Sequence, residues 1–382
     1  MVQMTPPMGW NTWNTFAEKI DEALIMESAD AIVKSGLRDA GYNYVVIDDT
    51  WALPQRDANH RLVADPNKFP HGLKALGDYL HKNGLKFGLY SCAGCMTCAQ
   101  HPGSYEHEFL DAESFAEWGV DFLKYDYCFK PIDDKGEMLY RRMGTALANC
   151  GRDILFSACS WGADETHRWI KTTGANMWRS TSDIVDGWES IKALTKQQRE
   201  LLPYNGHGCF NDMDMLVVGM NGKGHVGFQG CDFIQYRTHF SLWAFLASPL
   251  MIGCDIRHMD DQTRSILLNK DVIAINQDSA YCTPFFIGGT GGTLRGGTEE
   301  CFIAARLLSN GDFAIGLFNL SDDVSNFYFC TAELGLNRSA GKKLVMTDLW
   351  SGASSETHDY YYTAAVKAHD CLLLRARVVD EI

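Results

Sequence analysis

The fold is decided by the stretch Val120-Asp121-Phe122-Leu123-Lys124-Tyr125-Asp126-Tyr127-Cys128. It joins an apolar run to a lysine and an aspartate at the point where a buried strand should end. A carboxylate in that position costs stability, and parallel barrels keep their catalytic groups at the C-terminal ends of their strands. The segment Met177–Asp183 repeats this design, with Arg179 four residues before Asp183. Two carboxylates placed in this way are the groups that cleavage of a glycosidic bond requires.

Short apolar runs with polar ends recur along roughly the first 280 residues, and amphipathic, helix-like segments separate them. The eight predicted strands are Pro7–Trp13, Tyr44–Asp49, Lys86–Cys92, Asp121–Cys128, Ile154–Trp161, Met177–Asp183, Asp214–Gly219 and Pro249–Asp255. The predicted helices between them include Ile25–Ala40, Pro70–Gly84, Asp111–Trp118, Met138–Asn149 and Phe240–Ala247. Strands that alternate with helices form parallel sheets, and eight repeats favour closure of the sheet. The sequence therefore predicts an α/β fold in which residues 1–280 form a catalytic (β/α)8 TIM barrel.

The pattern of apolar residues in the sequence changes after residue 280. The glycine-rich turn Gly288–Gly292 is followed by β-like runs that lack helical spacing, with turn signals such as Ser309–Asp312 between them. These runs are Cys301–Leu308, Phe313–Phe318, Asn326–Cys330, Lys343–Leu349 and Cys371–Val378. Short strands at this spacing predict that residues 281–382 form a C-terminal antiparallel β-sandwich.

The overall charge narrows the classes of partner. The 382-residue chain has a formal net charge of −14 and a pI of about 5.3, which argues against nucleic acid and anionic membrane surfaces. A small, neutral carbohydrate substrate is compatible with this charge, and the sequence leaves open whether the chain forms a homo-oligomer. Residues Met1–Pro7 lack a basic start followed by an apolar segment. We therefore expect a cytoplasmic protein, or a secreted one if a signal peptide has been removed.

Polar and aromatic residues gather at the predicted C-terminal ends of the strands. They are Trp13, Asp48, Asp49, Lys124, Asp126, Trp161, Arg179 and Asp183, and Asp214 lies in the polar stretch that leads into the seventh predicted strand. Ionised carboxylates accept hydrogen bonds from vicinal hydroxyls, and an indole face packs on the apolar C–H face of a sugar ring. This combination predicts a pocket for a monosaccharide.

Within this pocket, Asp126 suits the nucleophile. Lys124 points to the same side of the strand, since strand side chains alternate, and its charge should lower the pKa of Asp126. Asp183 would act as general acid and then as general base. Arg179 would grip the substrate or orient the carboxylates.

At this point the chain resembles glycoside hydrolase family 27, which contains retaining α-galactosidases and α-N-acetylgalactosaminidases. The resemblance is carried by blocks in family order, namely Met8–Trp13, Ile47–Trp51, Lys124–Cys128, Arg179–Ile184, Asn211–Leu216 and Asn276–Asp278. It implies a (β/α)8 barrel followed by a β-sandwich, and no metal or organic cofactor.

The same blocks imply a role for individual residues. Asp126 matches the nucleophile of the family and Asp183 its acid/base, while Asp48 and Asp49 match the pair that holds the C4 and C6 hydroxyls of the sugar. The other pocket residues implied by position are Trp13, Tyr90, Lys124, Arg179 and Asp214. The resemblance also implies a disulfide between Cys98 and Cys128.

The fifth predicted strand ends in Cys159-Ser160-Trp161-Gly162-Ala163, where galactosidases of the family usually have Cys-Glu-Trp. Serine with a nearby alanine resembles the α-N-acetylgalactosaminidases. Loss of the Glu makes room for an acetamide, which Ser160 could hydrogen-bond and Ala163 could face with an apolar wall.

The main hypothesis is therefore a retaining exo-α-glycosidase that removes terminal α-linked N-acetylgalactosamine by double displacement. The alternative is an α-galactosidase that removes terminal α-galactose. A more distant alternative is a non-catalytic galactoside-binding protein.

Three cysteines leave a further alternative open. Cys92, Cys95 and Cys98 have a spacing that could hold zinc or a cluster, but no second Cys/His pair follows at a standard spacing. Free thiols or a Cys98–Cys128 bridge are favoured instead.

Cys92 stands where the family usually has Asp, and Met213 where it usually has Pro. The cysteines of the N-terminal disulfide found in the animal enzymes are absent, and Cys159 lacks the later partner that it has in some relatives. Together these departures favour a bacterial-type cytosolic enzyme.

Overall fold

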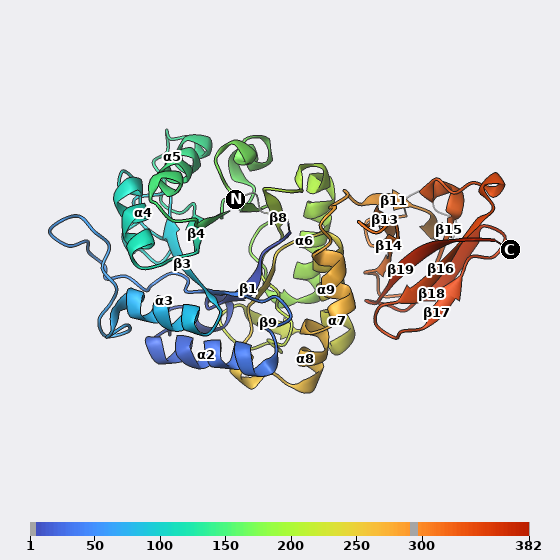
Figure 1. Ribbon diagram of the computed structural model, residues 1–382, viewed down its shortest axis with the longest axis horizontal. Helices are drawn as coiled ribbons and strands as arrows, with labels where there is room; N and C mark the ends of the chain where they lie inside the picture. Colours follow the sequence, from blue (N-terminus) through green and yellow to red (C-terminus); the bar gives the residue numbers. More distant parts are fainter. Residues whose placement is uncertain (1–4, 291–296, 382) are drawn as a thin grey trace.

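A computed structural model describes residues 5–290 and 297–381 of the chain. A barrel of parallel strands wrapped in helices comes first, and a unit of antiparallel strands packs beside it (Figure 1). This arrangement confirms the predicted (β/α)8 barrel followed by an antiparallel β-sandwich. Helix α9 (Lys270–Asn276) is the last helix of the barrel, and β11 (Phe285–Ile287) is the first strand of the sandwich.

The barrel sheet has eight parallel strands in the order β10-β1-β2-β3-β4-β5-β6-β8. The strands are β1 (Met8–Asn11), β2 (Tyr44–Val46), β3 (Lys86–Cys92), β4 (Phe122–Asp126), β5 (Leu155–Ala158), β6 (Met177–Arg179), β8 (Phe210–Asp212) and β10 (Leu250–Ile252). Leu216, which follows β8, pairs in parallel with Ile252, and its N–H donates to the Met251 carbonyl at 2.7 Å. The two edge strands are thereby joined, and the sheet closes.

Helices surround this barrel (Figure 1). They are α1 (Trp13–Phe16), α2 (Glu22–Ser35), α3 (Gly72–Lys82), α4 (Glu108–Glu117), α5 (Gly136–Asn149), α6 (Trp188–Leu201), α7 (Phe233–Phe245), α8 (Asp261–Leu267) and α9. Local sequence sets their ends. The Asp21 side chain caps the first turn of α2, and Asp232 and Gln235 form a capping box at the start of α7. Four of these helices, α1, α6, α8 and α9, were absent from the predicted helices.

The seventh predicted strand, Asp214–Gly219, is wrong in its position. The observed strand β8 ends at Asp212, because Asp214 adopts a left-handed backbone with φ of 77° that no strand can continue. The apolar run Met215–Val218 is nevertheless buried and bridges to β10 through Leu216. Because this connecting segment is buried, it has the same continuous apolar sequence as a barrel strand.

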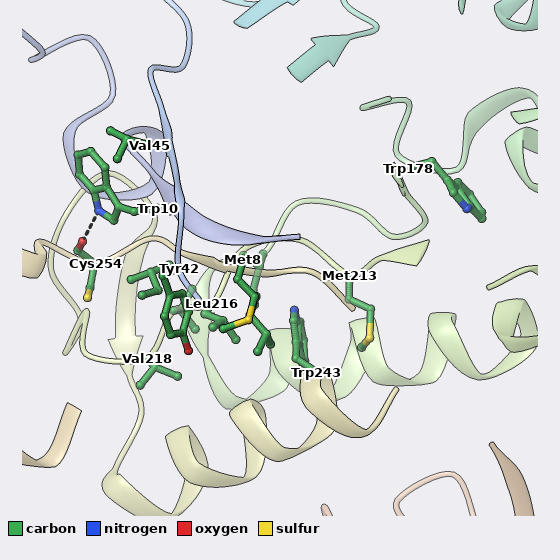
Figure 2. Close-up of a cluster of buried hydrophobic side chains, with 14 of the residues drawn as sticks. Met8, Trp10, Tyr42, Val45, Trp178, Met213, Leu216, Val218, Trp243 and Cys254 are labelled. Carbon is green, nitrogen blue, oxygen red and sulfur yellow. Dashed lines mark hydrogen bonds between the residues drawn. The ribbon is translucent and has the colours of Figure 1, made fainter. Parts of the chain in front are cut away.

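A continuous hydrophobic core lies between the barrel strands and the helices, and Figure 2 shows part of it. The fully buried Trp10 donates from its indole to the Cys254 carbonyl at 2.9 Å. Trp243 of α7, also fully buried, donates to the carbonyl of Asp214 at 2.8 Å. The core therefore fixes the loop after β8, which carries one of the predicted site residues.

The sandwich has two antiparallel sheets, in the orders β11-β13-β14-β19-β16-β17 and β12-β15-β18. Its strands are β11, β12 (Gly289–Thr290), β13 (Cys301–Leu307), β14 (Phe313–Asn319), β15 (Ser325–Cys330), β16 (Lys342–Asp348), β17 (Ser354–Glu356), β18 (Tyr361–Val366) and β19 (Cys371–Asp380). Residues 291 and 292 of the predicted glycine-rich turn lie outside the described residues.

The larger sheet of the sandwich is buried on both faces. Along β13, Ile303 packs into the core of the sandwich, whereas its neighbour Phe302 packs into the core of the barrel. Phe318 meets Phe245 of α7 with ring centroids 5.6 Å apart. The two units therefore share a hydrophobic interface on the helical wall of the barrel.

Within residues 5–290 and 297–381, no helix is both long enough and apolar enough to cross a bilayer.

Candidate active site

A cavity of about 190 Å³ opens where the barrel strands end. Its lining comes entirely from the barrel and consists of Trp13, Asn14, Asp48, Asp49, Tyr90, Cys98, Lys124, Asp126, Cys159, Trp161, Arg179, Asp183, Ile184, Val185, Asp214, Met215, His225 and Val226. Both carboxylates predicted to carry the chemistry, Asp126 and Asp183, are in this set. The closed barrel thus brings residues far apart in the sequence to one mouth, as the positions of the strand ends require.

Asp126, the last residue of β4, is 6% exposed and firmly held. One carboxylate oxygen accepts the N–H of Tyr127 at 2.9 Å, and the other accepts the Tyr90 hydroxyl at 3.0 Å. Burial raises the pKa of Asp126 to about 6, although the charge of Lys124 and these hydrogen bonds act in the opposite direction. The expectation that Lys124 would leave this pKa low is wrong in its net direction, because the cost of burying the charge is larger.

Asp183 has a different environment. Strand β6 ends at Arg179, so Asp183 lies in the loop that follows, and its side chain is 74% exposed. Arg179 contacts it at 2.8 Å and reaches Asp214 with the other terminal nitrogen at 3.2 Å. Partial burial favours the neutral acid, but the charge and hydrogen bond of Arg179 outweigh it, and the pKa of Asp183 lies below its ordinary value.

Asp214 anchors the loop that carries Asp183. One of its carboxylate oxygens accepts the N–H of Ile184 at 2.8 Å, and the other accepts the N–H of Met215 at 2.8 Å. Burial raises the pKa of Asp214, although Arg179 opposes this effect. Asp214 therefore holds both the guanidinium and the backbone next to the predicted acid/base.

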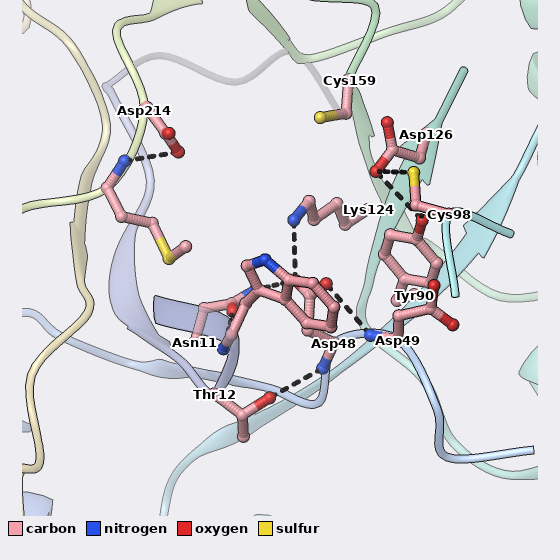
Figure 3. Close-up of polar contacts among 12 residues, drawn as sticks. Asn11, Thr12, Asp48, Asp49, Tyr90, Cys98, Lys124, Asp126, Cys159 and Asp214 are labelled. Carbon is pink, nitrogen blue, oxygen red and sulfur yellow. Dashed lines mark hydrogen bonds and ion pairs between the residues drawn. The ribbon is translucent and has the colours of Figure 1, made fainter. Parts of the chain in front are cut away.

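Asp48, Asp49 and Lys124 are buried together in the cavity lining, and Figure 3 shows their polar contacts. The Lys124 ammonium contacts Asp48 at 2.8 Å, and Asn11 donates to the same carboxylate oxygen at 2.7 Å. Asp49 accepts the N–H of Ala99 at 2.9 Å, and burial raises its pKa. These fixed, buried acceptors can bind the hydroxyls of a sugar.

Aromatic rings complete the walls. Tyr90 is almost fully buried, and Trp13 meets His225 edge-on with ring centroids 5.2 Å apart. Trp161 has a left-handed backbone with φ of 54°, at the start of a loop in which Asp164 and Glu165 are also left-handed. Such conformations persist only where the surrounding contacts fix them.

Ser160 and Ala163 are absent from the cavity lining. The Ser160 side chain is fully buried, and its hydroxyl lies 2.8 Å from that of Thr166. Side chains alternate along a strand, and it is Cys159 that faces the cavity with Trp161. The Ser160 side chain therefore does not line the cavity in which a 2-substituent was expected to meet it.

Cys98 and Cys128 form a disulfide. The Cys98 sulfur lies 3.5 Å from a carboxylate oxygen of Asp126, so the bridge borders the predicted nucleophile. Among the described residues, the group that could hold a metal is Cys98, Asp126 and Cys128. Its two sulfurs are bonded to each other and offer no thiolate, while Cys95 is exposed and Cys92 is buried.

Comparisons with known proteins match both parts of the chain, the barrel and the sandwich. The family described as alpha galactosidase A matches residues 5–278, and the alpha galactosidase C-terminal beta sandwich domain matches residues 299–376. The chain is 42% identical to alpha-galactosidase 3 of Arabidopsis thaliana over 372 residues, covering 96% of this chain and 80% of the relative. The chain belongs to the α-galactosidase family.

Solved structures of α-galactosidases have the same fold. Alpha-galactosidase I from Mortierella vinacea superposes with a TM-score of 0.88 at 34% identity, covering 98% of this chain and 97% of the other. The α-galactosidase of Saccharomyces cerevisiae, solved with raffinose, gives 0.85 at 28% identity and covers 98% of both chains. This member of the α-galactosidase family is therefore a glycoside hydrolase.

Several cavity residues of this α-galactosidase family member escaped the sequence analysis. They are Asn14, Cys159, Ile184, Val185, Met215, His225 and Val226. Most of them directly follow or precede a predicted site residue, so proximity to a strand end was the available signal. Val185 lies two residues after Asp183, and His225 and Val226 had no predicted residue near them, because they reach the mouth through a long connection after β8.

Proposed function

We propose that the protein is a retaining α-galactosidase that removes terminal α-linked galactose. The observation that carries the proposal is one cavity that joins a buried, hydrogen-bonded Asp126 to an exposed, arginine-paired Asp183. The identity to α-galactosidase 3 of Arabidopsis thaliana across 96% of the chain supports the same activity.

The proposed reaction is a double displacement. Asp126 attacks the anomeric carbon while Asp183 donates a proton to the departing oxygen, and a β-galactosyl ester forms on Asp126. Asp183 then takes a proton from water, which attacks the ester and releases α-galactose. The Tyr127 N–H and Tyr90 hydroxyl hold Asp126 in position, and the surrounding carboxylates stabilise the positive charge of the oxocarbenium-like transition state.

A general acid is expected to have a higher pKa than the nucleophile, but in the free site the order is reversed. The pKa of Asp126 is raised to about 6, and that of Asp183 lies below its ordinary value. A bound substrate covers the exposed Asp183 carboxyl, and the loss of water around it favours its neutral, proton-donating form. Substrate binding would thus prepare the acid, because only the occupied cavity removes solvent from Asp183.

Galactose is favoured over N-acetylgalactosamine as the substrate. The case for the acetamido sugar rested on Ser160 and Ala163, and neither side chain lines the cavity. The Ser160 hydroxyl instead shares a hydrogen bond with the Thr166 hydroxyl. Without an identified pocket for the acetamide, the 2-hydroxyl of galactose is the better match.

The test is a comparison of kcat/KM for p-nitrophenyl α-galactoside and p-nitrophenyl α-N-acetylgalactosaminide. The two substrates share a leaving group, so the ratio reports only on the 2-substituent. We expect at least a tenfold preference for galactose, which corresponds to about 1.4 kcal/mol of transition-state binding. A preference for the acetamido sugar would reject the proposal, and turnover of neither would point to a non-catalytic galactoside-binding protein.

A further inference from the structure

Two segments of the cavity wall run side by side. They end in a short parallel ribbon that pairs β7 (Asp186–Gly187) with β9 (Gly227–Gly230). One segment carries Asp183 three residues before β7, and the other carries His225 two residues before β9. Both side chains line the cavity. The ribbon therefore holds the segment of His225 next to the segment of the predicted acid/base.

Backbone contacts fix the place of His225. Its N–H donates to the carbonyl of Thr15 at 3.2 Å, and the N–H of Val226 donates to the carbonyl of Asn14 at 3.0 Å. A Cβ atom at Gly224 would stand 2.8 Å from the Cα of Thr15, so only glycine allows the two segments to approach so closely. His225 is thus held on the cavity wall by the segment that follows β1.

The imidazole of His225 is exposed at this wall. It meets Trp13 edge-on, with ring centroids 5.2 Å apart. Within residues 5–290 and 297–381 it makes no side-chain hydrogen bond or ion pair. A neutral imidazole has one nitrogen that donates and one that accepts, so both functions remain open to a molecule in the cavity.

The leaving group has to pass this wall. In the proposed reaction galactose lies against the buried Asp126, and the rest of the substrate lies beyond the exposed Asp183, which protonates the oxygen between them. Next to Asp183, the two segments supply four lining residues, which are Ile184, Val185, His225 and Val226. Three of these four are aliphatic, and His225 is the one whose side chain can hydrogen-bond. A hydroxyl that loses water at this wall needs such a partner.

We propose that His225 is a specificity-determining residue, whose imidazole hydrogen-bonds a hydroxyl of the leaving group and so favours galactosides in which the leaving group is a sugar. The proposal rests on the proposed function for the position of the cleaved bond. A hydrogen bond between neutral groups changes a binding or rate constant by about threefold to tenfold. A leaving group that has no hydroxyl gains nothing from the imidazole nitrogens.

The test compares kcat/KM for melibiose, in which the leaving group is glucose, with kcat/KM for phenyl α-galactoside, both measured by galactose release. His225→Phe keeps an aromatic ring against Trp13 and removes both nitrogens, whereas His225→Gln keeps a side chain that donates and accepts. We expect the ratio of melibiose to phenyl α-galactoside to fall by about threefold to tenfold in His225→Phe and by less than about twofold in His225→Gln.

His207→Phe is a matched control. His207 is also an exposed histidine, but it precedes β8 at the other end of the barrel and is not part of the cavity lining. This variant should keep the ratio of the native enzyme.

An unchanged ratio in His225→Phe would overturn the proposal, and so would an equal fall in the two His225 variants. An equal loss of kcat/KM on both substrates would overturn it as well, because His225 would then act only by packing against Trp13.

The two substrates carry the same sugar, so the test is separate from that of the proposed function. If the enzyme prefers N-acetylgalactosamine, the proposed function fails, and the ratio between the two galactosides still tests His225. If neither galactoside is turned over, their dissociation constants take the place of kcat/KM. The proposal then requires that His225→Phe weaken the binding of melibiose more than that of phenyl α-galactoside.

Discussion

Replacing the nucleophile should make the protein more stable at neutral pH. The substitution Asp126→Asn removes a charge that is 6% exposed while keeping an oxygen that can accept the N–H of Tyr127. We expect turnover of activated aryl α-galactosides to be abolished and the free energy of unfolding at pH 7 to rise. Active sites commonly sacrifice stability for function in this way.

The magnitude follows from the pKa of Asp126, which burial raises from 3.8 to about 6. At about 1.4 kcal/mol for each pKa unit, ionising the buried carboxyl costs the folded state roughly 3 kcal/mol. The sign follows from linkage. A raised folded-state pKa contributes stability that is complete below pH 3.8 and is lost as the pH rises through about 6. The asparagine variant does not ionise, so its advantage should be present at pH 7 and nearly absent at pH 4.

The assay is urea unfolding of both proteins at pH 4, 5, 6 and 7, followed by tryptophan fluorescence. We expect the difference in unfolding free energy to grow by about 2–3 kcal/mol across this range. Equal stabilities of the two proteins at every pH, or an advantage of the variant over the native protein that is smaller at pH 7 than at pH 4, would refute the reasoning. Asp278→Asn is a control, because the Asp278 carboxylate accepts the hydroxyl of the exposed Ser309 and is not part of the cavity lining.

Two further predictions concern the pH profile and the loop after β5. The catalytic pair must carry one proton to react, and the higher of its two pKa values is that of Asp126. We therefore expect kcat/KM to fall as the pH rises above about 6 and this proton is lost. A profile that stays level to pH 8 would contradict this assignment. The Tyr127 hydroxyl hydrogen-bonds Asp164, whose left-handed backbone with φ of 53° belongs to the loop that carries Trp161. Asp164→Ala removes the acceptor of this hydrogen bond, so it should raise KM severalfold and lower the free energy of unfolding in urea by about 1.5–3 kcal/mol. Asp164→Asn tolerates the left-handed backbone and still accepts the hydrogen bond, so it should change KM less than twofold. Equal effects of the two variants would reject a role for the hydrogen bond.

The sequence was most informative about polar residues at strand ends, where the residue type indicates chemistry and the fold determines the position. Lys124, Asp126 and Arg179 were predicted to meet because parallel strands present their C-terminal ends at one face, and all three line the cavity. The eightfold alternation of strands and helices was likewise readable from apolar periodicity. The spacing of Trp188, Ile191 and Leu194 offered the same signal for α6, although that helix was not assigned.

Other features depended on three-dimensional detail that the sequence does not hold. The side on which a strand-end residue points depends on where the strand stops, which is why Cys159 and not Ser160 faces the cavity. The net pKa of Asp126 depends on the balance between burial and the charge of Lys124, and neighbouring residue types reveal only the second of these.

The covalent role of Asp126 is the central step of the proposed reaction. A fluorinated α-galactosyl fluoride, which forms the glycosyl-enzyme faster than the ester is hydrolysed, should trap this intermediate. Mass spectrometry of the intact protein should then show the addition of one fluorogalactosyl group, and peptide mapping should place it on Asp126. A label on Asp183, or no label on an enzyme that turns over aryl α-galactosides, would contradict the account.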